Sequence, residues 1–141
     1  MIHLSELIGQ DAIALGTATK TGTVRRIILE GDRIVAVELS ESVIPADSVR
    51  SFEGDVLTYD EKTIITYGDR VGVDPRKLRV LDMNGDEIGS IADLEISADG
   101  HVETIVLTDG TTIAGFRLRA VGSYAAILTV DLPPPTGLPV A

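Results

Sequence analysis

Cysteine and tryptophan are absent from this chain of 141 residues, and histidine occurs only twice. Without cysteine, the chain can form neither a disulfide framework nor a thiolate site for metal or redox chemistry. Lys and Arg number 12 against 22 Asp and Glu, which gives a formal net charge of -10 at pH 7. Binding to phosphate backbones or anionic membrane surfaces depends on clustered Lys and Arg. We therefore expect no direct nucleic-acid partner.

Long apolar runs are also missing. No stretch approaches the roughly 20 apolar residues that cross a bilayer. A secretory signal begins with basic residues and continues into an apolar run, whereas residues 1–13 contain Glu6 and Asp11 and no basic residue. The sequence therefore predicts a cytoplasmic protein without membrane insertion.

Short apolar runs rich in Val, Ile and Thr are what the chain does contain, and these residue types suit a pleated, half-buried surface. Turn signals separate the runs at intervals of about 8–12 residues, which is typical of a small β-sandwich or barrel. Asn84-Gly85 is a strong hairpin signal, because both residues tolerate the positive φ of a type I′ turn. The pattern predicts an all-β fold.

The two halves of the chain repeat one pattern. Residues 22–24 (Gly-Thr-Val) align with residues 89–91 (Gly-Ser-Ile), and the apolar run at 34–39 aligns with the run at 102–107. A unit of about 50–60 residues buries too little surface to be stable by itself. We therefore expect the two copies to pack together through an interface or one merged core.

Two segments resemble the PRC-barrel family. Residues 43–60 (VIPADSVRSFEGDVLTYD) resemble the closing half of a PRC-barrel domain, and residues 80–107 (VLDMNGDEIGSIADLEISADGHVETIVL) resemble its opening half. The chain is thus similar to a tandem PRC-barrel protein. The resemblance implies two small β-barrels packed in tandem, with residues 1–67 as the first repeat, 68–131 as the second and 132–141 as a Pro-rich tail.

PRC-barrel domains serve as docking or assembly modules and share no catalytic set. The family includes the cytoplasmic domain of the photosynthetic reaction-centre H subunit and the C-terminal domain of the ribosome maturation factor. The resemblance therefore implies a non-enzymatic protein–protein interaction module. Two alternatives stay open. One is a small-ligand or metal-sensing domain with a polar pocket between the repeats, and the other is a ribosome-assembly or RNA-processing accessory factor that acts through a protein partner.

Candidate chemical sites are few. Asp82, Asn84 and Asp86 resemble the start of a calcium loop, but Glu87 stands where that loop needs glycine, so we interpret the segment as a plain hairpin turn. A catalytic triad or a histidine metal site would have to use His3 or His101, and no nucleophile motif accompanies either. We expect no catalytic residue, no bound metal and no cofactor.

Aromatic and proline-rich positions are the candidates for docking. We expect association with a protein partner, including self-association as a homo-oligomer, because apolar surface left outside two small barrels marks association sites. The core or the packing between barrels is the ordinary alternative for an aromatic side chain. The predicted interaction residues are Phe52, Tyr67, Phe116, Tyr124 and Pro134.

Overall fold

The computed structural model describes residues 1–60 and 72–129. Most of this part of the chain is β-strand, which confirms the all-β prediction. The helical elements are short: α1 (Leu4–Leu7) and the two 3-10 turns η1 (Ala46–Ser48) and η2 (Gly115–Arg117). The predicted interaction residues Tyr67 and Pro134 lie outside the described residues, as do both predicted repeat boundaries.

The strands fall into two groups, preceded by β1 (Ile2–His3). We call β2–β8 the first copy and β9–β14 the second copy. The first copy comprises β2 (Asp11–Ala14), β3 (Thr19–Thr23), β4 (Arg26–Glu30), β5 (Arg33–Glu38), β6 (Val43–Pro45), β7 (Val49–Ser51) and β8 (Leu57–Tyr59). The second copy comprises β9 (Arg79–Leu81), β10 (Glu87–Ile96), β11 (Val102–Leu107), β12 (Thr112–Ala114), β13 (Leu118–Val121) and β14 (Ala125–Leu128).

Strand pairing is the same in the two copies. β2 is antiparallel to β3 and parallel to β8, just as β9 is antiparallel to β10 and parallel to β14. The β4–β5–β6 ladder recurs as β10–β11–β12, and the β7–β8 pair recurs as β13–β14. β10 therefore covers in one strand what the first copy divides between β3 and β4. Residues at matching places in the two pairing schemes are called counterparts below.

The described strands form three sheets, and none of them closes into a barrel. The second copy is one sheet in the order β12-β11-β10-β9-β14-β13, with β1 added on β10. The first copy is divided between a four-stranded sheet in the order β3-β2-β8-β7 and a three-stranded sheet in the order β4-β5-β6. The described strands therefore do not confirm the two predicted barrels.

The two copies meet through matched backbone hydrogen bonds. Arg33 and His101 are counterparts and form an antiparallel bridge. The amide of Ile34 donates to Gly100 O at 2.8 Å, and the amide of its counterpart Val102 donates to Asp32 O at 2.7 Å. A two-fold rotation would exchange these bonds, so the hairpins β4–β5 and β10–β11 join as the subunits of an isologous dimer do.

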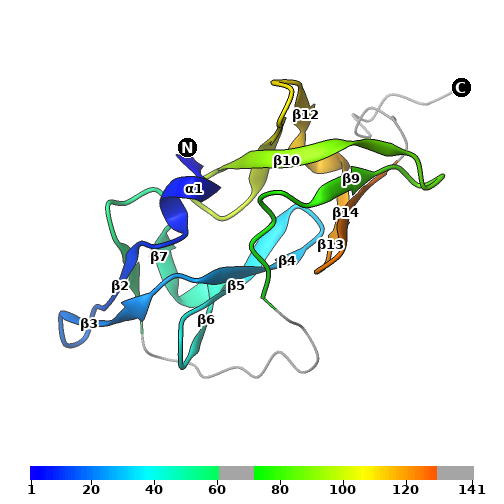
Figure 1. Cartoon of the computed structure of the whole chain (residues 1–141). Helices are drawn as coiled ribbons and strands as arrows, with labels where there is room; N and C mark the ends of the chain where they lie inside the picture. The colour runs from blue at the N-terminus through cyan, green and yellow to red at the C-terminus, as the bar shows by residue number, and fades with distance from the viewer. Residues whose placement is uncertain (61–71, 130–141) are drawn as a thin grey trace, which may run out of the picture.

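The segment that precedes each copy pairs with a strand of the other copy. β1 pairs with β10 through the register Ile2↔Ile96 and His3↔Glu95, and Figure 1 shows α1 lying beside β10. In the opposite direction, Val73 forms a two-bond bridge with Ile27 of β4. Each copy thus completes a sheet of the other, so the two copies are interlocked as well as in contact.

One hydrophobic core results from this arrangement. It joins side chains of α1 to residues from both copies, among them Leu4, Ile34, Leu94 and Ile105, all fully buried. A merged core of this kind supplies the buried apolar area that a unit of 50–60 residues lacks by itself.

Phe52 belongs to this internal interface. Its side chain is only 2% exposed, and its amide donates to Ala98 O at 3.0 Å in the turn between β10 and β11. Its ring lies against Gly100, where a Cβ would stand 2.9 Å from Phe52 Cε2. The prediction that Phe52 is available to a separate partner is corrected by this burial, because its contact surface faces the other copy of the same chain.

Replacement of Gly100 by alanine tests the contact between copies. Gly100 and Gly110 have nearly the same positive φ (89° and 88°), but a Cβ at Gly110 has nothing within 4 Å. Gly110→Ala should therefore cost only the backbone strain, about 1–2 kcal/mol. Gly100→Ala should lower the free energy of unfolding by at least about 1 kcal/mol more, because the methyl group overpacks the Phe52 ring. Urea denaturation measures both, and equal losses would contradict the interface.

Candidate docking surface

In the calcium-like turn at residues 82–86, the polar groups form hydrogen bonds with one another. The Oδ1 atom of Asp82 accepts hydrogen bonds from the amides of Asn84 (2.8 Å) and Asp86 (3.0 Å), and the amide of Gly85 donates to Asp82 O. This arrangement is an aspartate-stabilised hairpin turn between β9 and β10. Within residues 1–60 and 72–129, no group of three His, Asp or Glu side chains is placed to hold a metal ion.

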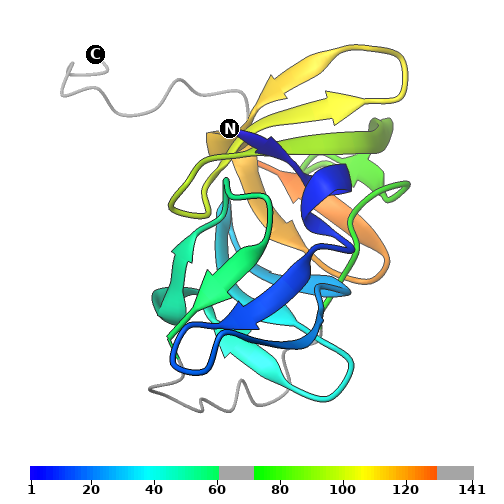
Figure 2. The ribbon, with the colours of Figure 1, turned by 90° about the vertical axis from the view of Figure 1, so that its left-hand side faces the viewer.

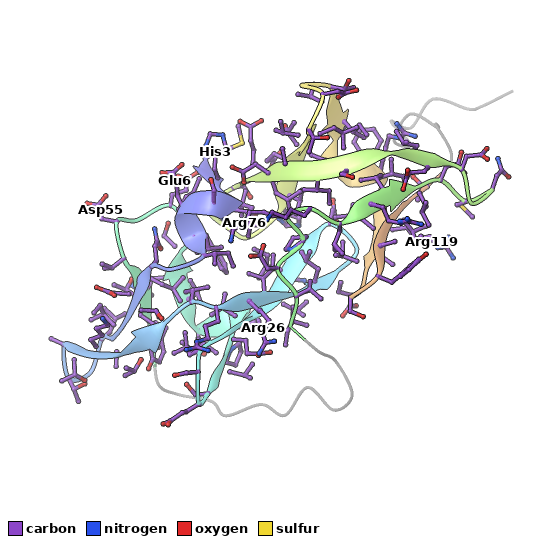
Figure 3. All side chains as sticks on the ribbon, in the orientation of Figure 1. His3, Glu6, Arg26, Asp55, Arg76 and Arg119 are labelled. Atoms are coloured by element: carbon purple, nitrogen blue, oxygen red, sulfur yellow. The ribbon has the colours of Figure 1, made fainter. Side chains whose placement is uncertain are left out.

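Both histidines lie beside acidic groups, His3 at the end of β1 and His101 at the bridge to Arg33. His3 Nδ1 is 3.2 Å from Glu6 Oε1 at the start of α1, where Figure 3 labels the pair. His101 Nδ1 is 3.1 Å from Asp99 Oδ1, and the hydroxyl of Ser97 donates to the same carboxylate. The Ser97 hydroxyl and the His101 imidazole lower the pKa of Asp99 to about 2.

These three side chains at the β10–β11 turn do not have the order of a catalytic triad. A triad needs the histidine between the serine and the aspartate, so that the imidazole takes the serine proton. Here the carboxylate of Asp99 stands between Ser97 and His101, so the hydroxyl proton is held by an ionised aspartate. The geometry stabilises the turn and leaves Ser97 without a base.

An open depression of ≈ 510 Å³ is formed by residues 74–108, within the second half of the chain, and not between the repeats, where the small-ligand alternative places its pocket. Asp74, Arg76, Lys77, Ile91, Ala92 and Thr108 line it. Arg76 points toward α1 in Figure 3, and its guanidinium already binds the carboxylate of Asp74 with two short bonds, Nε–Oδ1 at 2.9 Å and Nη2–Oδ2 at 2.6 Å. The pair of guanidinium donors that would bind an external carboxylate or phosphate is therefore already occupied by Asp74.

Removal of the Asp74 charge should weaken the fold in a pH-dependent way. The hydrogen bond from Arg76 lowers the pKa of Asp74 below 3.8, so the pair stabilises the folded state above that pH and loses its effect as pH falls through the lowered value. Because each side chain is about one-third exposed, Asp74→Asn should cost only about 0.5–1 kcal/mol at pH 7.

The matching control is the double variant Asp74→Asn/Arg76→Gln, which should differ little from Arg76→Gln at pH 7. Thermal unfolding followed from pH 3 to 7 measures the difference between Asp74→Asn and the unaltered chain. A difference that stays constant over that range would contradict the ion pair.

The exposed apolar side chains divide unequally between the copies. The first copy exposes Leu15 and Val56, whereas the second exposes Met83, Ile88, Phe116 and Tyr124. Leu15 and Met83 are counterparts, but the positions that match Ile88, Phe116 and Tyr124 are exposed polar residues in the first copy, namely Thr21, Asp47 and Asp55. Asp55 stands out into solvent in Figure 3. Both exposed aromatic side chains of the described structure therefore lie in the second copy.

Tyr124 is the most exposed of them, at 72%, and it lies in a defined arrangement. The guanidinium carbon of Arg79 stands 5.3 Å from the centre of its ring, and Arg79 Nη1 donates to Tyr124 Oη at 3.1 Å. Arg79 Nε is 3.3 Å from Glu87 Oε1 on the next strand. The three side chains form a row from the residue before β14 across β9 to β10, which holds the exposed tyrosine in place.

Two of the predicted interaction residues, Phe116 and Tyr124, are thus exposed, while Phe52 is internal. Two further residues were not predicted: Arg79, which contacts Tyr124, and Ile88, which is also exposed in the second copy. Ile88 could have been found by comparing the two repeats position by position, since the polar counterpart Thr21 marks it as unusual. Nothing in the sequence indicates that Arg79 stacks on Tyr124, because that contact depends on the parallel β9–β14 register.

Neither a family model nor a curated protein matches the chain. In the part of the chain that the structure describes, no helix has the length and apolar character needed to span a bilayer.

Proposed function

We propose that this chain is a non-enzymatic, cytoplasmic docking module, built from two PRC-barrel-like units, that binds other proteins through the surface of its second copy. One observation supports the proposal: two copies with the same strand pairing differ at matched surface positions. Phe116 and Tyr124 replace the counterparts Asp47 and Asp55.

The comparison between the two copies indicates which exposed residues the fold does not require. Where the first copy folds with an aspartate at an exposed position, the fold has no need of an aromatic side chain at the counterpart. Exposed Phe and Tyr carry a cost in solubility, and Tyr and Arg are the residue types that contribute most to protein interfaces. The stacked pair of Tyr124 and Arg79 supplies both types at one place, already ordered before binding.

Charge favours a different protein over a second copy of this chain as the partner. Each chain carries a formal net charge of -10, so two copies repel one another. A basic partner is attracted by the same field, and attraction of this kind raises the rate of association. Self-association stays a prediction of the sequence and takes second place in the proposal.

Photo-crosslinking at counterpart positions tests the proposal. p-Benzoylphenylalanine at position 116 or 124 should form covalent adducts with a defined protein when cells of the native host are irradiated. The same probe in place of Asp47 or Asp55 should form few adducts, because these sites have the same local backbone but lie on the other copy. Mass spectrometry identifies the adduct and the crosslinked residue.

The variant Tyr124→Asp, which gives the second copy the residue type of the first, should reduce the adduct formed at position 116 several-fold without lowering the thermal midpoint. Equal crosslinking from both copies, or adducts from neither, would contradict a docking surface on the second copy.

A further inference from the structure

β12 is one of the two outer strands of the seven-stranded sheet, and β13 is the other. Among the described residues it pairs with β11 alone. Figure 2 shows the β11–β12 hairpin at the upper rim of the molecule, with the amber strand β12 outermost. The side chains of Thr112 and Ala114 are exposed, and only Ile113 turns inward. An outer strand of this kind offers unpaired amides and carbonyls to another chain.

The register of the hairpin shows which groups are free. The amide of Leu107 donates to Thr111 O at 2.8 Å, so these residues form a hydrogen-bonded pair at the turn. Such pairs recur at every second position of an antiparallel ladder, which makes Ile105 and Ile113 the next one. The amides of Thr112 and Ala114 and the carbonyl of Thr112 therefore point away from β11, toward the open side, while the carbonyl of Ala114 belongs to the N-cap of η2.

The first copy closes the counterpart edge with a proline. Pro45 ends β6 and pairs with Ala36, as Ala114 ends β12 and pairs with Thr104, and each residue directly precedes a 3-10 turn. Their φ angles are -60° and -62°, so the backbone conformation is similar, but Pro45 is buried and has no N–H group, whereas Ala114 is exposed and keeps its N–H group. Proline on an edge strand removes the donor that another strand would use. The edge of the second copy keeps this donor.

The residues around β12 indicate what kind of chain would bind there. Glu103 stands on β11 opposite the end of β12, and Asp109 stands in the turn before its start. Both are exposed, and neither forms an ion pair within residues 1–60 and 72–129. The Thr111 amide, which donates to Asp109 Oδ1 at 2.8 Å, lowers the pKa of Asp109 and keeps it ionised. Negative charge thus stands at both ends of the open edge.

We propose that β12 binds an extended segment of another protein as an added β-strand, with Lys or Arg side chains of that segment placed near Glu103 and Asp109. The inference rests on the proposed docking function and names its partner's chemistry. Backbone bonds to Thr112 and Ala114 hold the segment, the two carboxylates select basic side chains, and Phe116, 46% exposed just beyond the strand, covers an apolar side chain.

The variant Ala114→Pro should block strand addition at β12 without destabilising the fold. The φ of Ala114 already suits proline, and its amide has no partner on β11, so the variant should fold with an unchanged or slightly raised thermal midpoint. It should lose the added strand, because the outward donor is gone and the ring blocks the approach. Ala114→Ser, which keeps the amide, is the matched control.

The binding probe is the synthetic peptide acetyl-Lys-Thr-Val-Thr-Val-Lys-amide, added to the full-length ¹⁵N-labelled chain. We expect saturable chemical-shift changes centred on the Thr112 and Ala114 amides, and slower hydrogen exchange of both. Ala114→Pro should weaken the binding at least ten-fold, while Ala114→Ser should not. Glu103→Gln/Asp109→Asn should also weaken it, and the loss should match that caused by raised salt.

The outcomes distinguish this inference from the proposed function. No shifts at millimolar peptide, shifts centred elsewhere, or equal binding by Ala114→Pro would overturn strand addition at β12, while crosslinks from positions 116 and 124 would leave the docking function standing. Protection of the Thr112 and Ala114 amides that grows with protein concentration in the absence of peptide, and is lost in Ala114→Pro, would identify a second copy as the occupant and overturn the basic partner.

Discussion

Two backbone hydrogen bonds at the centre of the molecule, from Ile34 to Gly100 and from Val102 to Asp32, fix how the copies face each other. Their near-equal lengths, 2.8 and 2.7 Å, follow from the local two-fold symmetry, since each donor is the counterpart of the other. Around this contact the leading segments cross, with β1 on β10 and Val73 on Ile27. One hydrophobic core forms from both copies.

This symmetry makes the differences between the copies informative. Internal positions are matched, as with Gly22 and Gly89, whose missing side chains make room for the counterpart leucines Leu39 and Leu107. Exposed positions are not matched, because Asp47 and Asp55 of the first copy correspond to Phe116 and Tyr124 of the second. The strand pairing is therefore shared, while the exposed residues on which the proposed docking function rests belong to one copy. A duplicated fold can keep one unit for stability and give the other an exposed edge.

The sequence allowed the local part of this account to be predicted. Turn residues such as Asn84-Gly85 and the apolar runs at 34–39 and 102–107 depend on neighbouring residues, so strands, hairpins and the repeat were accessible. The crossing of β1 onto β10 was not, because Ile2 and His3 carry no signal that selects a strand more than 90 residues away. For the same reason Phe52 could not be separated from the exposed aromatics, since its burial comes from the turn of the other copy. Phe116 and Tyr124 were predicted because their residue type alone marks them.

Native-state hydrogen exchange across both copies is the measurement that tests the interlocked fold most directly. The amides of Ile34 and Val102, and core amides on either side such as those of Val37 and Ile105, should open with the same free energy and merge into one global unfolding transition as denaturant is added. A set of amides from one copy that opens at a free energy lower by more than about 2 kcal/mol, while the other copy stays protected, would show that the copies unfold independently and would contradict the account.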